Sequence, residues 1–355
     1  RNTYKRMESE YMKGNTCGPI FKAQLKDEAV KLSKKYNPRI FAIGSVEFNL
    51  LIRKYFLPLA RLAQNNSFVF ETAIGINCLS KTEWTNLHNY LMSKSEHNKV
   101  DGDFKHYDKD LAAKNFLIAM AFLIALAKYS GNYSETDIKV MEGLAEDAAF
   151  IFLLSDGDLI RLFGGNPSGW PLTALLNSIM NSLYMRYVWA QFYKLTTFTS
   201  FVALMTYGDD NIMDIAEGKS KFNHTSIKDV LGKCGITYTM ADKNAKSVPY
   251  IPLSKTSFLK RGFRYDRLLD CWVAPLEEKS IFKSLAWNIK SKAITEPEHI
   301  FSILTSANIE NFAYGKEYFL KKHSFLMHIV KAYDLTSLYE RYGLMSYEQI
   351  VERYY

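Results

Sequence analysis

Cysteine is scarce in this chain, with 4 in 355 residues, and no two of them form a Cys-x-x-Cys pair. Cysteines so widely separated do not support a zinc site or a disulfide framework, so we expect a protein of a reducing compartment. Long apolar runs are also lacking. The longest, residues 116–127, is too short to cross a bilayer and predicts a buried helix. The first residues lack the pattern of a signal peptide, and because the chain starts at Arg1 without Met, we expect a piece cut from a longer protein.

The composition excludes a disordered protein. Hydrophobic residues make up 48% of the chain and charged residues 23%, which is typical of a folded globular protein. A length of 355 residues is enough for two or three domains. The formal net charge of +8 suits a polyanionic partner such as nucleic acid, although many basic proteins bind none.

The most informative stretch is residues 201–215, FVALMTYGDDNIMDI. Two runs of strand-forming residues flank a turn at Gly208, Asp209 and Asp210, which predicts a hairpin. Adjacent carboxylates at a hairpin tip repel each other unless a cation lies between them. A site that holds a divalent metal against phosphate oxygens would use such a pair. For so short a motif, a solvated acidic turn is the alternative.

A second acidic stretch lies at residues 100–111, VDGDFKHYDKDL. Asp103 and Asp108 are five residues apart, so a continuous strand would put them on opposite faces. If the chain turns after Asp103, both side chains can face one cavity. The spacing does not choose between these residues and Asp101 or Asp110. An acidic helix start is a further alternative, because carboxylates are favourable at helix N-termini.

Residues 164–193 open with a Gly/Pro-rich loop and continue as a helix with an apolar face of helical spacing. Ser168 and Gly169 in the loop allow the backbone to approach a partner closely. An uncharged polar stripe follows at i, i+4 and i+8, where Asn and Thr can hydrogen-bond a ligand without repelling phosphate. Its members are Thr173, Asn177 and Asn181. The alternative for this stripe is an ordinary wet helix face.

Positive charge stands out at three further places, two clusters and one single lysine. Five cations in fourteen positions predict a basic loop or ribbon that grips triphosphate, or a solvated surface: Lys26, Lys31, Lys34, Lys35 and Arg39. Lys243 follows a strand-like run at residues 235–240 and has an ordinary surface lysine as its alternative. Lys260 and Arg261 lie between aromatic residues in a hairpin-like element at residues 257–263, a weak indication of contact with a nucleic-acid backbone.

The remaining periodicity predicts mostly helices. We expect them at residues 40–63, 82–94, 111–129, 137–154, 226–235, 281–289, 298–308, 318–333 and 347–354. Residues 64–80 predict loop and turn, and residues 275–355 contain no obvious strand.

Taken in order, these motifs resemble those of the RNA-dependent RNA polymerases of picornavirus-like positive-strand RNA viruses. The matching pieces cover residues 25–263: KDE with the downstream Arg39, D-x4-D at Asp103 and Asp108, S-G-x3-T-x3-N at Ser168, Gly169, Thr173 and Asn177, YGDD at 207–210, ADK ending at Lys243, and FLKRGF at 258–263. Each motif alone is weak, whereas six in one order are highly specific. Two features depart from the family pattern. Residues 36–39 replace the usual Gly-Lys approach to the arginine, and we expect that the chain lacks much of the N-terminal fingers segment.

The resemblance implies an α+β right hand, with an antiparallel palm sheet backed by helices and a helical thumb. The implied domains are fingers at residues 1–99, palm at 100–130, a fingers insertion at 131–163, palm at 164–265 and thumb at 266–355. The implied function is RNA-directed RNA synthesis on a single-stranded RNA template, with NTPs, nascent RNA and other viral replication proteins as partners. The implied location is a membrane-associated replication complex in the host cytoplasm.

The resemblance also implies residue roles. Asp103, Asp209 and Asp210 would bind two Mg²⁺ or Mn²⁺ ions, and Lys243 would donate a proton to departing pyrophosphate. Lys26, a lysine of the 31–35 group (Lys35 is our choice) and Arg39 would hold the triphosphate. The residues that would read the ribose and its surroundings are Asp108, Ser168, Gly169, Thr173 and Asn177. Lys260 and Arg261 would support the primer end.

Two rival interpretations belong to other classes. Reverse transcriptases share the palm and two metals, but they typically carry a non-Gly residue where Gly208 stands and an aromatic residue where Asp108 stands. This chain has neither feature. A non-catalytic RNA-binding remnant of a polymerase is the second rival, and an extension assay on a primed template would separate it from an enzyme.

Overall fold

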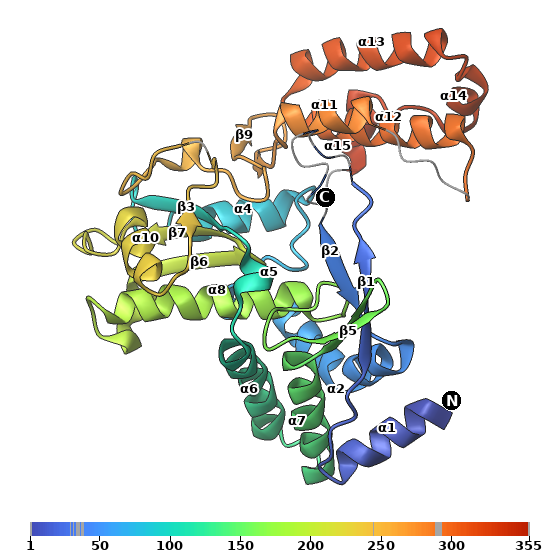
Figure 1. The fold of residues 1–355 in the computed structure, drawn as a ribbon. Helices are drawn as coiled ribbons and strands as arrows, with labels where there is room; N and C mark the ends of the chain where they lie inside the picture. Colours follow the sequence, from blue (N-terminus) through green and yellow to red (C-terminus); the bar gives the residue numbers. More distant parts are fainter. Residues whose placement is uncertain are drawn as a thin grey trace. The chain divides into compact units, whose positions relative to one another are not determined.

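The structure is a computed structural model, and it describes residues 2–28, 30, 32, 36, 39–243, 245–287 and 293–353 (Figure 1). The chain forms two compact units, each built from three segments. Unit 1 contains Arg1–Gly75, Gly102–Asn211 and Lys219–Pro249. Unit 2 contains Ile76–Asp101, Ile212–Gly218 and Tyr250–Tyr355. The bounds of fingers, palm and thumb given above stay predictions.

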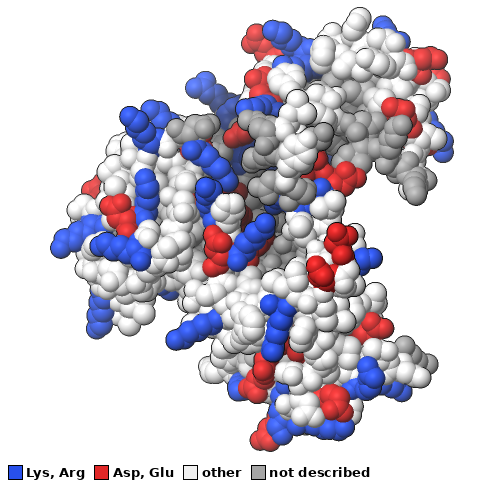
Figure 2. All heavy atoms as spheres, viewed as in Figure 1, with Lys and Arg blue, Asp and Glu red and all other residues white. Residues whose placement is uncertain are grey.

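Charged side chains of both signs cover much of the face shown in Figure 2. Lys and Arg predominate on it, as the net charge of +8 leads one to expect, and Asp and Glu lie among them. The positive charge on this face is therefore interspersed with acidic groups and does not form one uniform patch.

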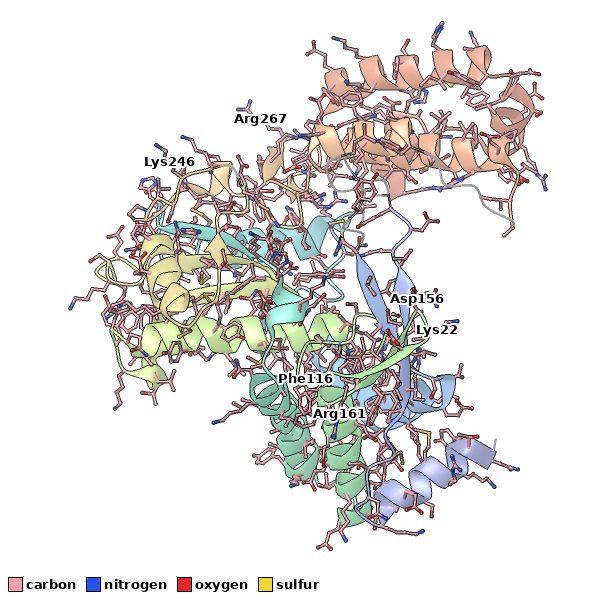
Figure 3. All side chains as sticks on the ribbon, in the orientation of Figure 1. Lys22, Phe116, Asp156, Arg161, Lys246 and Arg267 are labelled. Atoms are coloured by element: carbon pink, nitrogen blue, oxygen red, sulfur yellow. The ribbon has the colours of Figure 1, made fainter. Side chains whose placement is uncertain are left out.

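A four-stranded sheet in unit 1 has the order β2-β1-β4-β5. Its strands are β1 (Ile20–Leu25), β2 (Ile40–Ile43), β4 (Phe152–Ser155) and β5 (Asp158–Arg161). β1 pairs antiparallel with β2 and parallel with β4, and a tight turn at Asp156 and Gly157 joins β4 to β5. Lys22, Asp156 and Arg161 mark this sheet in Figure 3. The Arg161 guanidinium lies over the rings of Phe152 and Phe163, at 5.4 and 5.5 Å.

Two helix predictions were wrong at the edges of this sheet. Residues 40–43, predicted as helix, form β2, and helix α2 (Val46–Asn65) begins only after Ser45, whose side chain accepts a hydrogen bond from the Phe48 backbone N–H. Helix α7 (Glu135–Ala149) ends before Leu154, because residues 152–155 pair in the sheet as β4. The predicted loop at 64–80 also contains a short helix, α3 (Ser67–Phe70).

Unit 1 contains six further α-helices among the described residues. They are α1 (Asn2–Met12), α5 (Tyr107–Asp110), α6 (Ala113–Ser130), α8 (Thr173–Ala190), α9 (Phe198–Phe201) and α10 (His224–Lys233). α6 packs against α7, α8 and α2. Among the helices of the described ranges, α6 is the one whose length and composition would allow it to cross a membrane. Its Phe116, Met120 and Leu123 are buried, as predicted for a core helix.

A second sheet carries the acidic motifs and has the order β6-β7-β3-β8. Its strands are β6 (Val202–Tyr207), β7 (Asp210–Ile215), β3 (Lys99–Phe104) and β8 (Tyr238–Thr239). The predicted hairpin at residues 201–215 is confirmed as β6 and β7. β3 lies between β7 and β8, and it pairs antiparallel with β8 through Asp103↔Thr239 and Phe104↔Tyr238. Helix α8 packs against β6.

Unit 2 is mainly helical. Helix α4 (Lys81–Tyr90) and the hairpin of β9 (Arg264–Asp266) and β10 (Cys271–Val273) precede five helices, which are α11 (Glu278–Ala286), α12 (Glu296–Phe312), α13 (Lys316–Ala332), α14 (Thr336–Tyr342) and α15 (Tyr347–Arg353). Within the described residues no strand follows β10, as predicted, while α14 was not expected. The hairpin-like element at 257–263 is confirmed as a tight turn, with Leu259 and Lys260 at φ 55° and 59°.

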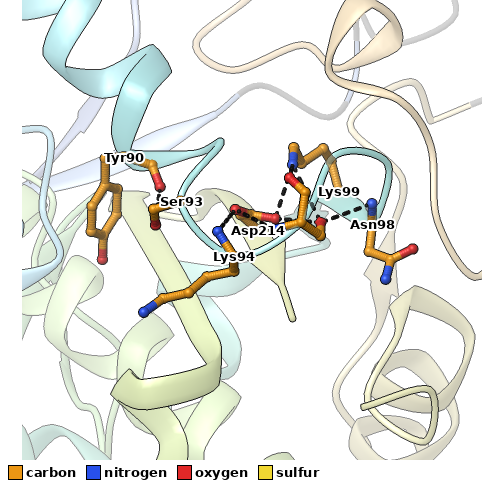
Figure 4. Close-up of polar contacts among 7 residues, drawn as sticks. Tyr90, Ser93, Lys94, Asn98, Lys99 and Asp214 are labelled. Atoms are coloured by element: carbon orange, nitrogen blue, oxygen red, sulfur yellow. Dashed lines mark hydrogen bonds and ion pairs between the residues drawn. The ribbon is translucent and has the colours of Figure 1, made fainter. Parts of the chain in front are cut away.

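A fully buried ion pair joins the first residue of β3 to β7 within unit 2 (Figure 4). Lys99 Nζ lies 2.9 Å from Asp214 Oδ1, and both side chains are 0% exposed. Asp214 also accepts hydrogen bonds from the Ser95 hydroxyl at 2.7 Å and from the Lys94 backbone N–H at 2.6 Å. Lys99 donates a further bond to the Ser95 carbonyl oxygen at 2.6 Å. Both buried charges are thus paired and hydrogen-bonded, as burial of an ion requires.

Candidate functional site

Side chains of helix α8 hydrogen-bond to the backbone of the acidic turn. Gly208 and Asp209 form the two-residue loop between β6 and β7, and Gly208 has φ +63°, a conformation that glycine adopts at little cost. The Ser178 hydroxyl accepts a hydrogen bond from the Gly208 N–H at 2.9 Å. The Asn181 amide donates to the carbonyl oxygens of residues 208, 209 and 210. The backbone of the turn is therefore fixed on both its donor and its acceptor sides.

Asp103 lies on β3, next to the strand that begins at Asp210. Its carboxylate is almost buried, with 11% of the side chain exposed, and Oδ2 lies 2.5 Å from Lys243 Nζ. This contact with Asp103 is the largest cause of a raised pKa of Lys243, which keeps the ammonium protonated. The structure thus brings the first acidic motif, the hairpin strand and the predicted lysine together.

The carboxyl groups of this region repel one another. Asp209 is an exposed residue at the tip of the turn, but protein atoms crowd its carboxyl group. That loss of water is the largest cause that raises the pKa of Asp209 to about 6, and repulsion from Asp103 and Asp108 adds to it. Lys243 opposes the shift. Asp103, Asp108 and Asp209 therefore share one electrostatic neighbourhood.

The two alternatives for the acidic pair lie elsewhere. Asp101 Oδ2 accepts a hydrogen bond from the Ser257 backbone N–H at 2.8 Å, inside unit 2. Asp110 is exposed at the end of α5. The spacing argument could not separate these four aspartates, whereas the contacts of Asp103 and Asp108 do.

Asn177 and Asp108, which the resemblance implies as readers of the ribose, are in contact. Asn177 Nδ2 donates to Asp108 Oδ1 at 2.5 Å, and the Ser168 hydroxyl lies 3.5 Å from Asp108 Oδ2, at the limit of a hydrogen bond. Asn166, which the sequence analysis missed, sets the direction of this contact. Its Nδ2 donates to Asn177 Oδ1 at 2.8 Å, so the NH₂ group of Asn177 must face the carboxylate. The Trp170 indole N–H in turn holds Asn166 Oδ1 at 2.8 Å.

Gly169 and Thr173 have structural partners within the protein. The Gly169 N–H donates to the Ala42 carbonyl oxygen at 2.9 Å, and a Cβ at position 169 would lie 2.5 Å from that oxygen. The close approach that this glycine permits is therefore to β2. The Thr173 hydroxyl donates to carbonyl oxygens of the preceding loop, at Pro167 and Trp170. The predicted substrate contacts of Gly169 and Thr173 stay predictions.

The predicted triphosphate-binding cations are partly within the described residues. The Lys26 N–H donates to the Arg39 carbonyl oxygen at 2.8 Å, one position beyond the Leu25↔Ile40 pair of β1 and β2. Lys26 is exposed, and the Arg39 guanidinium is 65% exposed with Glu28 at 3.3 Å. Pairing of the two strands thus brings Lys26 and Arg39 together. Lys31, Lys34 and Lys35 lie outside the described residues.

The two predicted RNA-binding cations differ in their surroundings. Lys260 is exposed at the tip of its turn. The Arg261 side chain is 12% exposed, and its guanidinium forms a two-pronged contact with Glu310 at 2.7 and 2.8 Å and donates to the Ala274 carbonyl oxygen. Arg261 therefore has a structural contact within unit 2, and RNA contact by either residue stays a prediction.

The chemistry of the carboxylates favours a metal site here, although their side chains are not already gathered around one point. Among the described residues, no three His, Cys, Asp or Glu side chains are gathered closely enough to hold an ion. Carboxylate oxygens are nevertheless the donors that Mg²⁺ prefers. A cation would relieve the repulsion that adds to burial in raising the pKa of Asp209, and the Lys243 ammonium already lies against Asp103. The residues present therefore fit a divalent cation.

Comparison with known proteins places these motifs in context. A family model described as viral RNA-dependent RNA polymerase matches residues 1–332. The chain is 32% identical to part of the RNA1 polyprotein of Cherry rasp leaf virus, over 83% of the chain and 14% of the polyprotein. It is 28% identical to part of the replicase polyprotein of Drosophila C virus, over 91% of the chain and 19% of that polyprotein. The chain thus spans less than a fifth of the length of either relative.

A solved structure resembles the whole fold. The chain matches the structure titled Sicinivirus 3Dpol RNA dependent RNA polymerase with a TM-score of 0.79 and 17% identity. The match covers 99% of this chain and 70% of the other. At this identity the likeness concerns the fold alone, and it confirms the predicted α+β right-hand architecture.

Proposed function

Because the chain belongs to the viral RNA-dependent RNA polymerase family, we propose that it synthesises RNA on an RNA template by adding nucleotides from NTPs to a 3′ end. The observation that carries this proposal is the neighbourhood of Asp103 and Asp209. Asp103 lies on β3, beside the strand that follows the turn carrying Asp209, although the two residues are about a hundred positions apart in sequence. Burial raises the pKa of Asp209, and the charge of Asp103 adds to that shift. The test is extension of a primed homopolymer template by the purified chain, and absence of extension would favour the RNA-binding remnant.

In this reaction the 3′-oxygen attacks the α-phosphorus in line, and the bond from that phosphorus to the pyrophosphate oxygen breaks. Asp103, Asp209 and Asp210 would hold two Mg²⁺ or Mn²⁺ ions, which when bound stabilise charge on the attacking and leaving oxygens. Lys243 is kept protonated by its raised pKa, so it can offer a proton to the departing pyrophosphate once it leaves Asp103. Lys26 and Arg39, with Lys35, would neutralise the triphosphate.

The relatives also indicate where in the cell the chain would act. They are polyproteins of viruses, so we infer that the chain acts in infected host cells, in the cytoplasm and together with other viral replication proteins. Attachment of that complex to membranes is part of the same proposal.

Choice of the sugar is expected to depend on Asn177. A site that hydrogen-bonds a hydroxyl rejects an analogue without it, because the polar groups of the site are left unpaired. Asp108, held by Asn177 and close to Ser168, would accept the hydrogen bond of the 2′-hydroxyl. We expect Asn177→Ala to lower the preference for ATP over dATP, measured as the ratio of kcat/KM, about 10- to 100-fold.

The matched control for this prediction is Asn115→Ala. Asn115 lies on α6 and donates to the Tyr184 hydroxyl at 3.3 Å, so its loss removes an asparagine that does not touch Asp108. We expect the control to keep the sugar preference of the wild type. An unchanged ratio in Asn177→Ala would mean that other residues read the sugar.

Binding of RNA is expected to weaken steeply with salt. Each phosphate contact on single-stranded nucleic acid contributes a slope of about −0.7 in log K against log salt. For about five contacts, a tenfold rise in salt would weaken binding about 3,000-fold.

Lys260→Gln should lower the slope by about 0.7 if the exposed ammonium contacts phosphate. Arg261→Gln should instead lower stability, because it leaves Glu310 without its partner. Salt-independent binding would contradict a channel that follows the RNA backbone.

A further inference from the structure

A line of three buried polar side chains ends at the acidic turn. The Tyr238 hydroxyl donates to Asn211 Oδ1 at 2.8 Å, and Asn211 Nδ2 donates to Asn181 Oδ1 at 3.0 Å. Asn181 Nδ2 then donates to the carbonyl oxygens of residues 208, 209 and 210 at 3.1, 3.1 and 3.3 Å. The three residues are 0%, 1% and 0% exposed, in the same order. We call these three side chains the Tyr238–Asn181 network.

The direction of every hydrogen bond in this network is fixed by the turn. Backbone carbonyl oxygens only accept, so the atom of Asn181 that faces them must be its NH₂ group. Its Oδ1 then faces Asn211, which must present its own NH₂ group. Asn211 Oδ1 is left facing Tyr238, whose hydroxyl supplies the proton. Reversing any one of the amides would set two acceptors against each other in a buried place, which is costly.

Gly102 is what allows Tyr238 to reach this network. Tyr238 lies on β8 and Asn211 on β7, with β3 between them in the sheet. The tyrosine therefore crosses β3, and it does so at Gly102. A Cβ at position 102 would lie 1.9 Å from the Tyr238 hydroxyl and 2.1 Å from its Cζ. Any other residue at this position would displace the ring. The glycine immediately before Asp103 therefore leaves the space that the Tyr238 side chain occupies.

Tyr238 also has contacts that do not involve the turn. Its ring lies 5.1 Å from Phe104, edge-on, and 4.9 Å from the stacked ring of His224. These ring contacts survive when the hydroxyl alone is removed. The hydroxyl can therefore be tested separately from the packing of the side chain.

We propose that Asn181, Asn211 and Tyr238 are positioning residues, which hold the backbone of residues 208–210 so that Asp209 and Asp210 keep a geometry suited to a divalent cation. The repulsion between carboxylates pushes the turn away from Asp103, and the fixed carbonyl oxygens resist that movement. Ser178 holds the Gly208 N–H, and Asn181 holds the carbonyl oxygens on the acceptor side of the turn. The catalytic consequence rests on the proposed function, whereas the consequence for cation binding does not.

The experiment compares Tyr238→Phe, Asn181→Leu and the double variant with a matched control, Tyr184→Phe. Tyr184 also packs near Phe104, at 5.9 Å, but its hydroxyl accepts from Asn115 and does not touch the network. Two assays are run on the full chain: electron paramagnetic resonance gives the dissociation constant of Mn²⁺, and primed extension gives kcat and KM. Thermal unfolding of each variant is recorded alongside.

We expect Tyr238→Phe to weaken Mn²⁺ binding and lower kcat about 3- to 10-fold, as for loss of one hydrogen bond, with the KM for NTP nearly unchanged. Asn181→Leu should lower both about 10- to 100-fold. The double variant should be no worse than Asn181→Leu, because the hydroxyl acts on the turn only through Asn181. Tyr184→Phe should match the wild type in both quantities.

Two results with the variants would overturn the inference. One is a Tyr238→Phe variant that equals Tyr184→Phe in Mn²⁺ affinity, and the other is a double variant whose losses multiply as for independent sites. Absence of extension by the wild type would contradict the proposed function alone, since Mn²⁺ affinity still decides the positioning role. A wild-type chain that binds no Mn²⁺ would overturn the positioning role as well.

Discussion

Replacing Asp209 with asparagine is expected to lower the rate of nucleotide addition about a thousandfold or more, since loss of a metal-binding carboxylate removes several kcal/mol of transition-state stabilisation. Asparagine keeps the size of the side chain, so the turn that Asn181 and Ser178 hold should persist. RNA binding should stay within about twofold of the wild type, because carboxylates do not attract phosphate. Primed extension in Mg²⁺ and a filter-binding titration with RNA measure the two quantities.

The control for this variant is Asp156→Asn. Asp156 also lies in a two-residue hairpin turn, between β4 and β5, and its φ of 50° is one that asparagine tolerates. It has no place in the proposed chemistry, so extension should continue at the wild-type rate. Near-normal extension by Asp209→Asn would refute the role of Asp209. Equal losses in both variants would point to a general effect of charge or folding.

Much of this candidate site could be predicted because its residues carry local signals. The run around Gly208 places a turn between two strand-forming stretches, and the positive φ at Gly208 explains why glycine stands there. The stripe that includes Asn177 follows from helical spacing. That Asp108 and Asn177 meet, however, came only from the family resemblance. Periodicity gives the faces of single elements and says nothing of which distant segments pack together.

The supporting residues gave weaker signals. Asn166, Asn211 and Tyr238 are neutral, so neither charge nor periodicity distinguishes them from surface or core residues, and their burial depends on partners far away in sequence. One signal was available. An isolated glycine inside a predicted strand indicates a close approach of another group. Gly102 stands inside the strand β3, and the group that approaches it is Tyr238.

Short strands were the other part of the fold that could not be predicted from the sequence. β2 has four residues, too few to separate strand from helix by periodicity, so it was joined to the long apolar helix behind it. β1 pairs in parallel with β4 across more than a hundred residues, an arrangement decided by tertiary packing. The long helices α6, α8, α12 and α13 were predicted because several turns of apolar spacing accumulate in each.

The largest effect on stability is expected at the buried pair of Lys99 and Asp214 (Figure 4). Lys99→Met removes the ammonium that pairs with Asp214, and it leaves a carboxylate that is 0% exposed without that counter-charge. Breaking such a pair by removing one partner costs about 3–5 kcal/mol of the free energy of unfolding. Urea unfolding measures this loss, followed by two spectroscopic probes because a chain of two units need not unfold in one step.

A second variant separates the buried charge from simple loss of packing. In the double variant Lys99→Met with Asp214→Asn no charge remains, and the Asn oxygen can still accept the N–H of Lys94. We therefore expect the double variant to be more stable than Lys99→Met alone. Glu348→Gln is the control in unit 2, because it breaks an exposed pair with Lys316 and should leave the unfolding midpoint nearly unchanged. The explanation by an unpaired buried charge would be wrong if Lys99→Met were no less stable than this control. It would also be wrong if the stability losses of Lys99→Met and Asp214→Asn were additive in the double variant.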